Sequence, residues 1–188
     1  MKKIITIVSE IIDSIQKEQP IIIAIDGRCA SGKTTLALEL QKKFACNIIH
    51  MDYFFLRPEQ RTKERLQTPG ENVDHERFLE EVLLPLKEGK IFSYRPYNCQ
   101  YQQFSEAVEI FPKEITIIEG SYSCHKSLWE YYDLRIFLSV EPEEQLRRIV
   151  AREGCEKAEI FKKRWIPLEE QYILAYHLEQ CCDYCFNS

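Results

Sequence analysis

The sequence predicts an α/β protein built on a doubly wound parallel sheet. Short apolar runs at residues 21–25, 115–118 and 134–140 are typical of strands buried on both faces. Segments with helical periodicity alternate with these runs, and a turn rich in small residues follows the first one. Strands that alternate with helices pair in parallel through right-handed crossovers, which gives this fold class.

The first element is an amphipathic helix over residues 3–18. Ile4, Val8 and Ile12 lie on one apolar stripe of this helix, and charged side chains lie on the opposite face. Pro20 ends the helix. The apolar run that follows is expected to be the central strand of the sheet.

A phosphate-binding loop follows the first strand. Residues 27–34 read Gly-Arg-Cys-Ala-Ser-Gly-Lys-Thr and match G-x-x-x-x-G-K-[ST] at every defined position. Glycines let the backbone bend into a ring of N–H donors for phosphate oxygens. We expect Lys33 to be exposed on the loop and to place its charge between the outer phosphates of ATP. The alternative is a strand-to-helix turn that binds nothing.

The same motif predicts a nucleotide site and part of a magnesium site. The Thr34 hydroxyl is expected to hold Mg²⁺. The residues expected to bind the nucleotide are Gly27, Arg28, Cys29, Ala30, Ser31, Gly32, Lys33, Thr34 and Thr35.

A candidate catalytic base follows the second strand. The loop helix is predicted over residues 34–44 and the strand over Cys46–His50, and Asp52 comes two residues later. Ligands of open α/β sheets bind at the carboxyl ends of the strands. Asp52 is therefore expected to accept the proton of a substrate hydroxyl. The alternative is a carboxylate that caps the turn.

The middle of the chain is predicted to face the substrate. Residues 57–70 are basic, contain two prolines and show no clean period, so we expect a loop there. Asp74 is a plausible N-cap for a helix to about residue 86. Residues 91–111 are aromatic and polar and suggest an irregular hairpin outside the main sheet. Its aromatic residues could instead form a cluster that only ties the hairpin to the domain.

Glu119 is the candidate magnesium carboxylate. It follows the apolar strand 115–118, at the position of a Walker-B-type acid. The alternative is a solvated glutamate at a strand end.

Arginines after the fourth strand are candidates for a lid over ATP. Pro142 begins a helix that Gly154 ends, and Arg148 and Arg152 share one face of it with i, i+4 spacing. We expect both arginines to act on the transferring phosphoryl group, with the lid at about residues 152–165. The alternative is a solvated helix face. A last helix is predicted over residues 168–180.

Composition limits the class of protein. The 188 residues suffice for one domain, and the net charge of −5 gives no overall attraction to nucleic acid. No apolar run approaches the ~20 residues needed to span a bilayer. We therefore expect a cytoplasmic protein that binds neither nucleic acid nor membrane. The sequence leaves a homo-oligomer open.

The eight cysteines are predicted to be free thiols, because one of them lies inside the phosphate loop. Cys181, Cys182 and Cys185, with His177 before them, could in principle bind zinc. The favoured alternative is a short strand with small apolar side chains.

The chain resembles the uridine kinase family of phosphate-loop kinases from about residue 21 to residue 187. The resemblance rests on the loop 27–34 and on the motifs His50-Met51-Asp52-Tyr53-Phe54-Phe55, Asn72-Val73-Asp74-His75-Glu76-Arg77-Phe78, Tyr94-Arg95-Pro96-Tyr97, Ile118-Glu119-Gly120 and Leu146-Arg147-Arg148.

The resemblance implies a five-stranded sheet of order 2-3-1-4-5 whose last strand is about residues 182–186. It implies that Asp52 binds and activates the 5′-hydroxyl of a nucleoside such as uridine or cytidine. Tyr97 would help to hold the nucleobase, and Arg95 would also contact the substrate. The whole chain, residues 1–188, would then be one kinase domain.

The leading hypothesis is therefore transfer of the ATP γ-phosphoryl group to a small hydroxyl compound, most plausibly a nucleoside. A first alternative is a kinase of the same type that acts on a sugar, a vitamin or another alcohol. A second is a nucleotide-binding switch that turns over little and signals through its loops.

Overall fold

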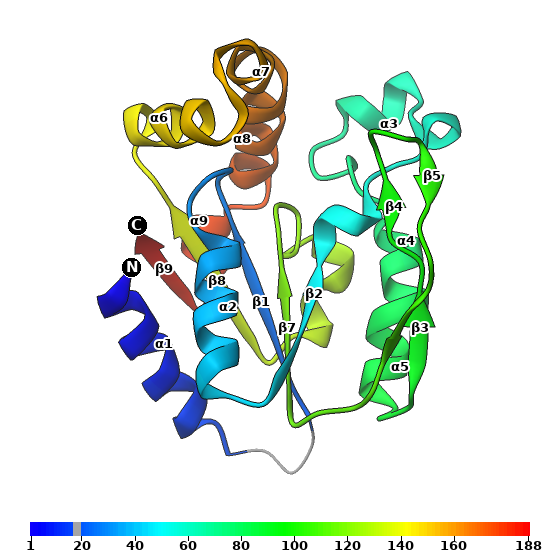
Figure 1. Cartoon of the computed structure of the whole chain (residues 1–188), viewed down its shortest axis with the longest axis vertical. Helices are drawn as coiled ribbons and strands as arrows, with labels where there is room; N and C mark the ends of the chain where they lie inside the picture. The colour runs from blue at the N-terminus through cyan, green and yellow to red at the C-terminus, as the bar shows by residue number, and fades with distance from the viewer. Residues whose placement is uncertain (17–19) are drawn as a thin grey trace.

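The chain folds around a five-stranded sheet in which neighbouring strands are parallel (Figure 1). The computed structural model describes residues 1–16 and 20–188. The strands of this sheet, in chain order, are β1 (Ile21–Gly27), β2 (Cys46–His50), β7 (Ile115–Glu119), β8 (Leu134–Ser139) and β9 (Tyr184–Asn187). They lie in the order β2-β7-β1-β8-β9, which is 2-3-1-4-5 within the sheet. The predicted architecture is confirmed.

Helices cover both faces of the sheet, and alternate side chains of β1 enter the two resulting cores. Ile23 and Ile25 pack against α1 (Lys2–Ser14) and α2 (Lys33–Lys43). Ile22 and Ala24 point to the other face. That face is covered by α4 (His75–Phe78), η3 (Leu79–Leu83), α5 (Leu84–Lys87), η4 (Lys126–Tyr131), α8 (Ile166–Ala175) and α9 (Leu178–Cys181).

Two groups of elements rise beyond the carboxyl ends of the strands, at the top of Figure 1. One is formed by α6 (Pro142–Glu153), α7 (Cys155–Ile160) and η5 (Phe161–Trp165), which are together called the lid below, and it includes residues 152–165, where the sequence predicts a lid over ATP. The other contains the short turns η1 (Met51–Phe54) and η2 (Pro58–Gln60) and helix α3 (Lys63–Gln67).

The predicted hairpin lies outside the main sheet. It consists of two small antiparallel pairs. These pairs are β3 (Phe92–Tyr94) with β6 (Val108–Ile110), and β4 (Tyr97–Asn98) with β5 (Gln103–Phe104).

Four boundaries differ from the prediction. The region 57–70 contains η2 and α3 in place of an unstructured loop. The last helix is two helices, because His177 takes a left-handed conformation with φ of +51° and begins α9. The last strand starts at Tyr184, since Cys182 packs into the core and Asp183 accepts a bond from the amide of Arg135. The first helix also ends earlier than the predicted residue 18: α1 stops at Ser14, because the backbone of Ile15 is extended with φ of −74° and ψ of 110°.

No helix within residues 1–16 or 20–188 has both the length and the apolar character that crossing a membrane would require.

Asp26 links the central strand to the helices behind it. The carboxylate is 1% exposed and accepts hydrogen bonds from the amides of Gly27 (2.6 Å) and Cys124 (2.8 Å) and from the Tyr172 hydroxyl (2.7 Å). Burial raises the pKa of Asp26, and these hydrogen bonds act in the opposite direction. Three segments that are far apart in the sequence are therefore fixed at the start of the phosphate loop.

We predict that Tyr172→Phe lowers the free energy of unfolding by about 1.5–3 kcal/mol, because it removes a donor from a buried carboxylate. Chemical denaturation monitored by circular dichroism measures this change. Tyr101→Phe is the matched control, since Tyr101 is 66% exposed, and it should change stability by no more than about 0.5 kcal/mol. Equal effects of the two variants would contradict the role given to Asp26.

Candidate active site

The loop between β1 and α2 is shaped by glycines. Gly27 has a φ of +143°, and a Cβ on it would lie 2.1 Å from the carbonyl oxygen of Leu138 on β8. Only glycine allows the two backbones to pack this closely. Gly32, at the N-cap of α2, has a φ of +92°. Both glycines of the sequence motif are therefore required by the backbone geometry.

Lys33 lies across the loop and is enclosed by it. The residue is 8% exposed, and Nζ donates to the carbonyl oxygens of Gly27 (2.7 Å) and Arg28 (3.0 Å) and to Oγ of Ser121 (3.4 Å). The expectation of an exposed lysine is wrong, because each of its three ammonium hydrogens has an acceptor within the protein.

Thr34 and Glu119 meet in the same region. The Thr34 hydroxyl donates to Oε2 of Glu119 at 3.0 Å, and the other carboxylate oxygen is hydrogen-bonded to Nδ1 of His50. This bond with Glu119 raises the pKa of His50. Hydroxyl and carboxylate oxygens are the ligands that Mg²⁺ prefers, so the pair fits the predicted metal position.

His50 is a site residue that the sequence analysis missed. It is the last residue of β2 and lies directly opposite Glu119 in the parallel register. The available signal was that both residues end buried strands, and such ends meet at one edge of the sheet.

Asp52 lies in η1, directly after β2, and its side chain opens into the cavity described below. Asp52 is exposed to the cavity. The protein around it still desolvates the carboxylate enough to raise its pKa, while Lys33 acts in the opposite direction. Gly120 makes room for this carboxylate, because a Cβ there would lie 3.2 Å from Oδ1. A carboxylate with a raised pKa is suited to accept a proton near neutral pH.

Two of the three arginines of α6 face the loop. Arg148 donates to the carbonyl oxygen of Ala30 at 3.1 Å, and Arg152 lies 3.8 Å from Sγ of Cys29. Both line the cavity, and their action on a phosphoryl group stays a prediction. The side chain of Arg147 is 71% exposed and points to solvent.

The side chain of Arg28 leaves the site. Its guanidinium bonds to Glu170 at 2.7 and 3.0 Å, to Glu179 at 2.6 Å and to the Ser139 hydroxyl at 2.7 Å. Any contact of this residue with a nucleotide would therefore come from its backbone.

One cavity of about 910 Å³ lies at the carboxyl edge of the sheet, and it is lined by Lys33, Thr34, Asp52, Glu119, Arg148 and Arg152. Its volume is at the upper end of the range for small-molecule sites. One part is bounded by the loop and the lid, and the other by the segment after Asp52. The lining residues beyond those already described are Thr35, Phe55, Leu56, Arg61, Leu66, Asn72, Cys99, Tyr122, Glu153, Phe161, Arg164, Trp165 and Glu169.

Two predicted substrate residues lie outside the cavity lining. Tyr97 is 4% exposed, and its ring packs edge-on against Phe104 with centroids 5.5 Å apart. Arg95 donates to the carbonyl oxygen of Ser105. This packing matches the alternative of an aromatic cluster that ties down the hairpin. A substrate contact by either residue would require the hairpin to move and stays a prediction.

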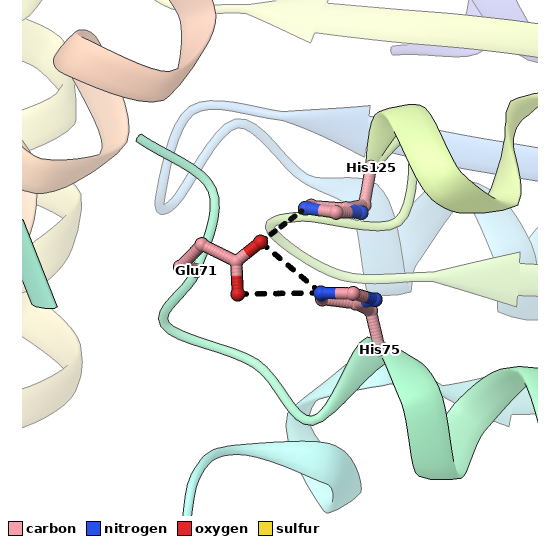
Figure 2. Close-up of side chains that lie close together, drawn as sticks. All are labelled: Glu71, His75 and His125. Carbon is pink, nitrogen blue, oxygen red and sulfur yellow. Dashed lines mark hydrogen bonds and ion pairs between the residues drawn. The ribbon is translucent and has the colours of Figure 1, made fainter. Parts of the chain in front are cut away.

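A second cluster of titratable groups, Glu71, His75 and His125, lies outside the cavity lining (Figure 2). The rings of His75 and His125 are stacked with centroids 4.0 Å apart, and Nε2 of each faces the Glu71 carboxylate, at 3.1 and 3.6 Å. The amide of Ser127 donates to Nδ1 of His125 at 3.2 Å. The proton of this imidazole is therefore on Nε2, next to Glu71 and the Tyr176 hydroxyl. A protonated Nε2 has no free lone pair for a metal ion. The cluster is therefore better explained as a set of hydrogen bonds that connects its segments than as a metal site.

The cysteines at the end of the chain do not converge on a common point. Cys182 is buried with its Sγ 3.9 Å from that of Cys124, whereas Cys181 and Cys185 are exposed. Cys185 belongs to β9, in agreement with the short strand that the sequence analysis preferred to a zinc site.

Comparison with known proteins identifies the family. A model of the phosphoribulokinase/uridine kinase family matches residues 22–157. Uridine-cytidine kinase B of Dictyostelium discoideum is 30% identical over 150 residues, which cover 74% of this chain and 61% of that protein. A uridine kinase of Staphylococcus aureus is 29% identical over 147 residues, covering 72% of this chain and 70% of that one. The match thus spans less than two thirds of the Dictyostelium protein.

Solved structures share the fold. One is described as a possible uridine kinase from Bacillus stearothermophilus, with a TM-score of 0.76, 19% identity and coverage of 98% of each chain. D-glycerate 3-kinase from Cryptococcus neoformans has a TM-score of 0.58 and 17% identity, covering 87% of this chain and 83% of that one.

The histidine cluster predicts a dependence of stability on pH. Burial, with His75 as the second cause, lowers the pKa of His125 to about 3. The unfolded chain then binds a proton that the folded chain excludes, so stability falls as the pH decreases from about 6.5 toward 4. One such group contributes a slope of about 1.4 kcal/mol per pH unit. His125→Gln should lose this part of the slope in denaturation curves at pH 4–7, and an unchanged slope would contradict the assignment.

Proposed function

The chain belongs to the phosphoribulokinase/uridine kinase family, and on that basis we propose that it is a kinase that transfers the γ-phosphoryl group of ATP to a hydroxyl group of a small molecule. The observation that carries the proposal is the position of Asp52 in the cavity that also contains Lys33, Thr34 and Glu119. A carboxylate base beside phosphate-binding groups is what hydroxyl phosphorylation requires.

In the proposed reaction the acceptor oxygen attacks the γ-phosphorus, and the bond from that phosphorus to the bridging oxygen of the departing ADP breaks. Asp52 takes the proton of the acceptor hydroxyl. Lys33 stabilises the charge that develops on the phosphoryl oxygens, with Arg148 and Arg152 positioned to join it from the lid. Mg²⁺, held by Thr34 and Glu119, would neutralise charge on the phosphates.

We propose the 5′-hydroxyl of a nucleoside such as uridine or cytidine as the acceptor. The relatives named as uridine and uridine-cytidine kinases support this choice. The cavity wall near Asp52 offers two aromatic rings, Phe55 and Tyr122, and one amide, Asn72, which suit a flat polar ring. The alternatives are another alcohol as acceptor, or a nucleotide-dependent switch with little turnover.

The proposal extends to the setting of the enzyme. Residues 1–188 would act as one kinase domain, and the eight free thiols suit a reducing compartment such as the cytoplasm. No contact with nucleic acid or membrane is part of the proposal.

A coupled assay of ADP formation across nucleosides, sugars and vitamins, with ATP and Mg²⁺, tests this function. We expect turnover with at least one nucleoside, and Lys33→Met should reduce kcat by about 10²-fold or more because it removes the cation over the phosphates. Turnover with another alcohol only would exclude the nucleoside while keeping the kinase. ATP hydrolysis that no acceptor stimulates would favour the switch.

We predict that Asp52→Asn lowers kcat by about 10²-fold or more and changes the affinity for ATP much less. The substitution keeps the shape of the side chain and removes the charge that accepts the proton. Steady-state kinetics with saturating acceptor, combined with calorimetric ATP titration, separates the two effects. A variant that keeps kcat and loses ATP affinity would assign Asp52 to the metal.

A further inference from the structure

A buried glutamate from the C-terminal helices reaches the phosphate loop. Glu169 lies in the first turn of α8, directly after the lid, and is 8% exposed. Its Oε2 accepts a hydrogen bond from the amide of Cys29 at 2.9 Å, and its Oε1 accepts one from the Ser121 hydroxyl at 2.9 Å. One carboxylate thus joins the loop after β1 to the turn after β7.

Ser121 connects Glu169 to Lys33, because its hydroxyl donates to one and accepts from the other. Ser121 has one hydroxyl hydrogen, and it gives that hydrogen to Glu169. The lone pairs of Oγ are then left to accept, and Nζ of Lys33 donates to this oxygen at 3.4 Å. Glu169 therefore acts on the position of Lys33 through Ser121.

Placing the Glu169 carboxylate in this position has two costs in free energy. Burial raises the pKa of Glu169, and Lys33 is the main group that acts in the opposite direction. A carboxylate lining a cavity meant for phosphates also repels them. An apolar residue at this position would avoid both costs. The free energy gained from the two hydrogen bonds therefore has to exceed the cost of burying the charge and of repelling phosphate.

The next residue on the helix provides a second anchor outside the cavity. Glu170 forms a two-pronged ion pair with Arg28 at 2.7 and 3.0 Å, and it does not line the cavity. Neighbouring residues of α8 therefore hold neighbouring residues of the loop, but only Glu169 does so from inside the site.

We propose that Glu169 is a positioning residue: it fixes the Cys29 amide and, through Ser121, the Lys33 ammonium in the arrangement that receives the terminal phosphates. The proposal rests on the proposed function, because that function gives Lys33 its role. Glu169 itself need not touch the nucleotide, and it transfers no proton.

Glu169→Gln is the variant that isolates this role. Glutamine has the same shape but one acceptor oxygen and one NH₂ group in place of two acceptors. If the glutamine oxygen accepts from the Cys29 amide, the Ser121 hydroxyl loses its acceptor. If the oxygen accepts from the Ser121 hydroxyl instead, the Cys29 amide loses its acceptor. Ser121→Ala removes the connection to Lys33 and leaves the bond between Glu169 and Cys29 intact.

The experiment measures ATP and ADP affinities by calorimetry for both single variants and the double variant. Each single variant should bind ATP about tenfold more weakly, since it disturbs a hydrogen bond to a charged group. The loss should be smaller for ADP, which lacks the outer phosphate near Lys33. The double variant should lose less than the sum of the two single losses if the glutamine no longer accepts the Ser121 hydrogen, and the sum if it no longer accepts the Cys29 amide. It therefore reports which of the two contacts the glutamine breaks.

Glu170→Gln is the matched control on the same helix. It should lower Tm by breaking the ion pair to Arg28, and it should keep the ratio of ATP to ADP affinity. Affinities of Glu169→Gln within about twofold of the parent would overturn the proposal. If Glu169→Gln fails to fold, Ser121→Ala with unchanged ATP affinity would overturn it as well.

The outcome is separable from that of the proposed function, because binding needs no acceptor. A parent protein that binds ATP but phosphorylates no acceptor disproves the kinase and leaves the affinity test valid. A parent protein that turns over, with a Glu169→Gln variant that binds ATP normally, disproves only the positioning role.

Discussion

The site depends on the parallel alignment of three strands. Ile25 of β1 and His50 of β2 lie on either side of Glu119 at the end of β7. Because the three strands end at one edge, the phosphate loop after β1 and the turn that contains Asp52 emerge beside each other. A shift of one residue in either pairing would turn Glu119 or His50 to the wrong face of the sheet. The cores on the two faces fix this register, so the packing of the sheet also sets the geometry of the site.

Lys33 balances the charge of this region before any nucleotide binds. Desolvation raises the pKa of Asp26, Asp52 and Glu169, and the positive charge of Lys33 acts on each pKa in the opposite direction. One cation thus opposes part of the desolvation of three carboxylates that come from three different segments, and the pKa of each stays raised. A phosphate entering the cavity would compete for the same cation. We therefore expect nucleotide binding to be coupled to the protonation of these carboxylates.

The sequence predicted the elements whose signal is local. The phosphate loop, Glu119 and Asp52 each lie next to a strand that its apolar run identifies, and the structure brings them to one cavity. The strand order followed from the family resemblance and is confirmed. The roles of these residues in the reaction stay predictions, because they concern groups that only a bound substrate would reveal.

Contacts across long sequence separations could not be predicted. Glu169 contacts Cys29, 140 residues earlier, and nothing along the sequence distinguishes it from the next residue, Glu170, which is only half-buried. The same holds for Arg28, whose guanidinium is drawn outward by Glu170 and Glu179. Lys33 is buried for the same reason, because Ser121, which helps to enclose it, comes from another strand end. Burial of charged groups depends on tertiary partners that a pattern along the chain does not contain.

The acceptor is harder to infer than the donor because of how each half of the cavity is built. The phosphate half comes largely from one continuous stretch, Cys29 to Thr35, whose spacing carries its own chemistry. The other half takes single residues from separate segments, among them Arg61, Asn72, Cys99 and Tyr122. Replacing one of these residues could change the acceptor without disturbing the fold or the phosphate loop. Under the proposed function, the acceptor would depend on a few side chains held by loops, and those side chains would decide between a nucleoside and another alcohol.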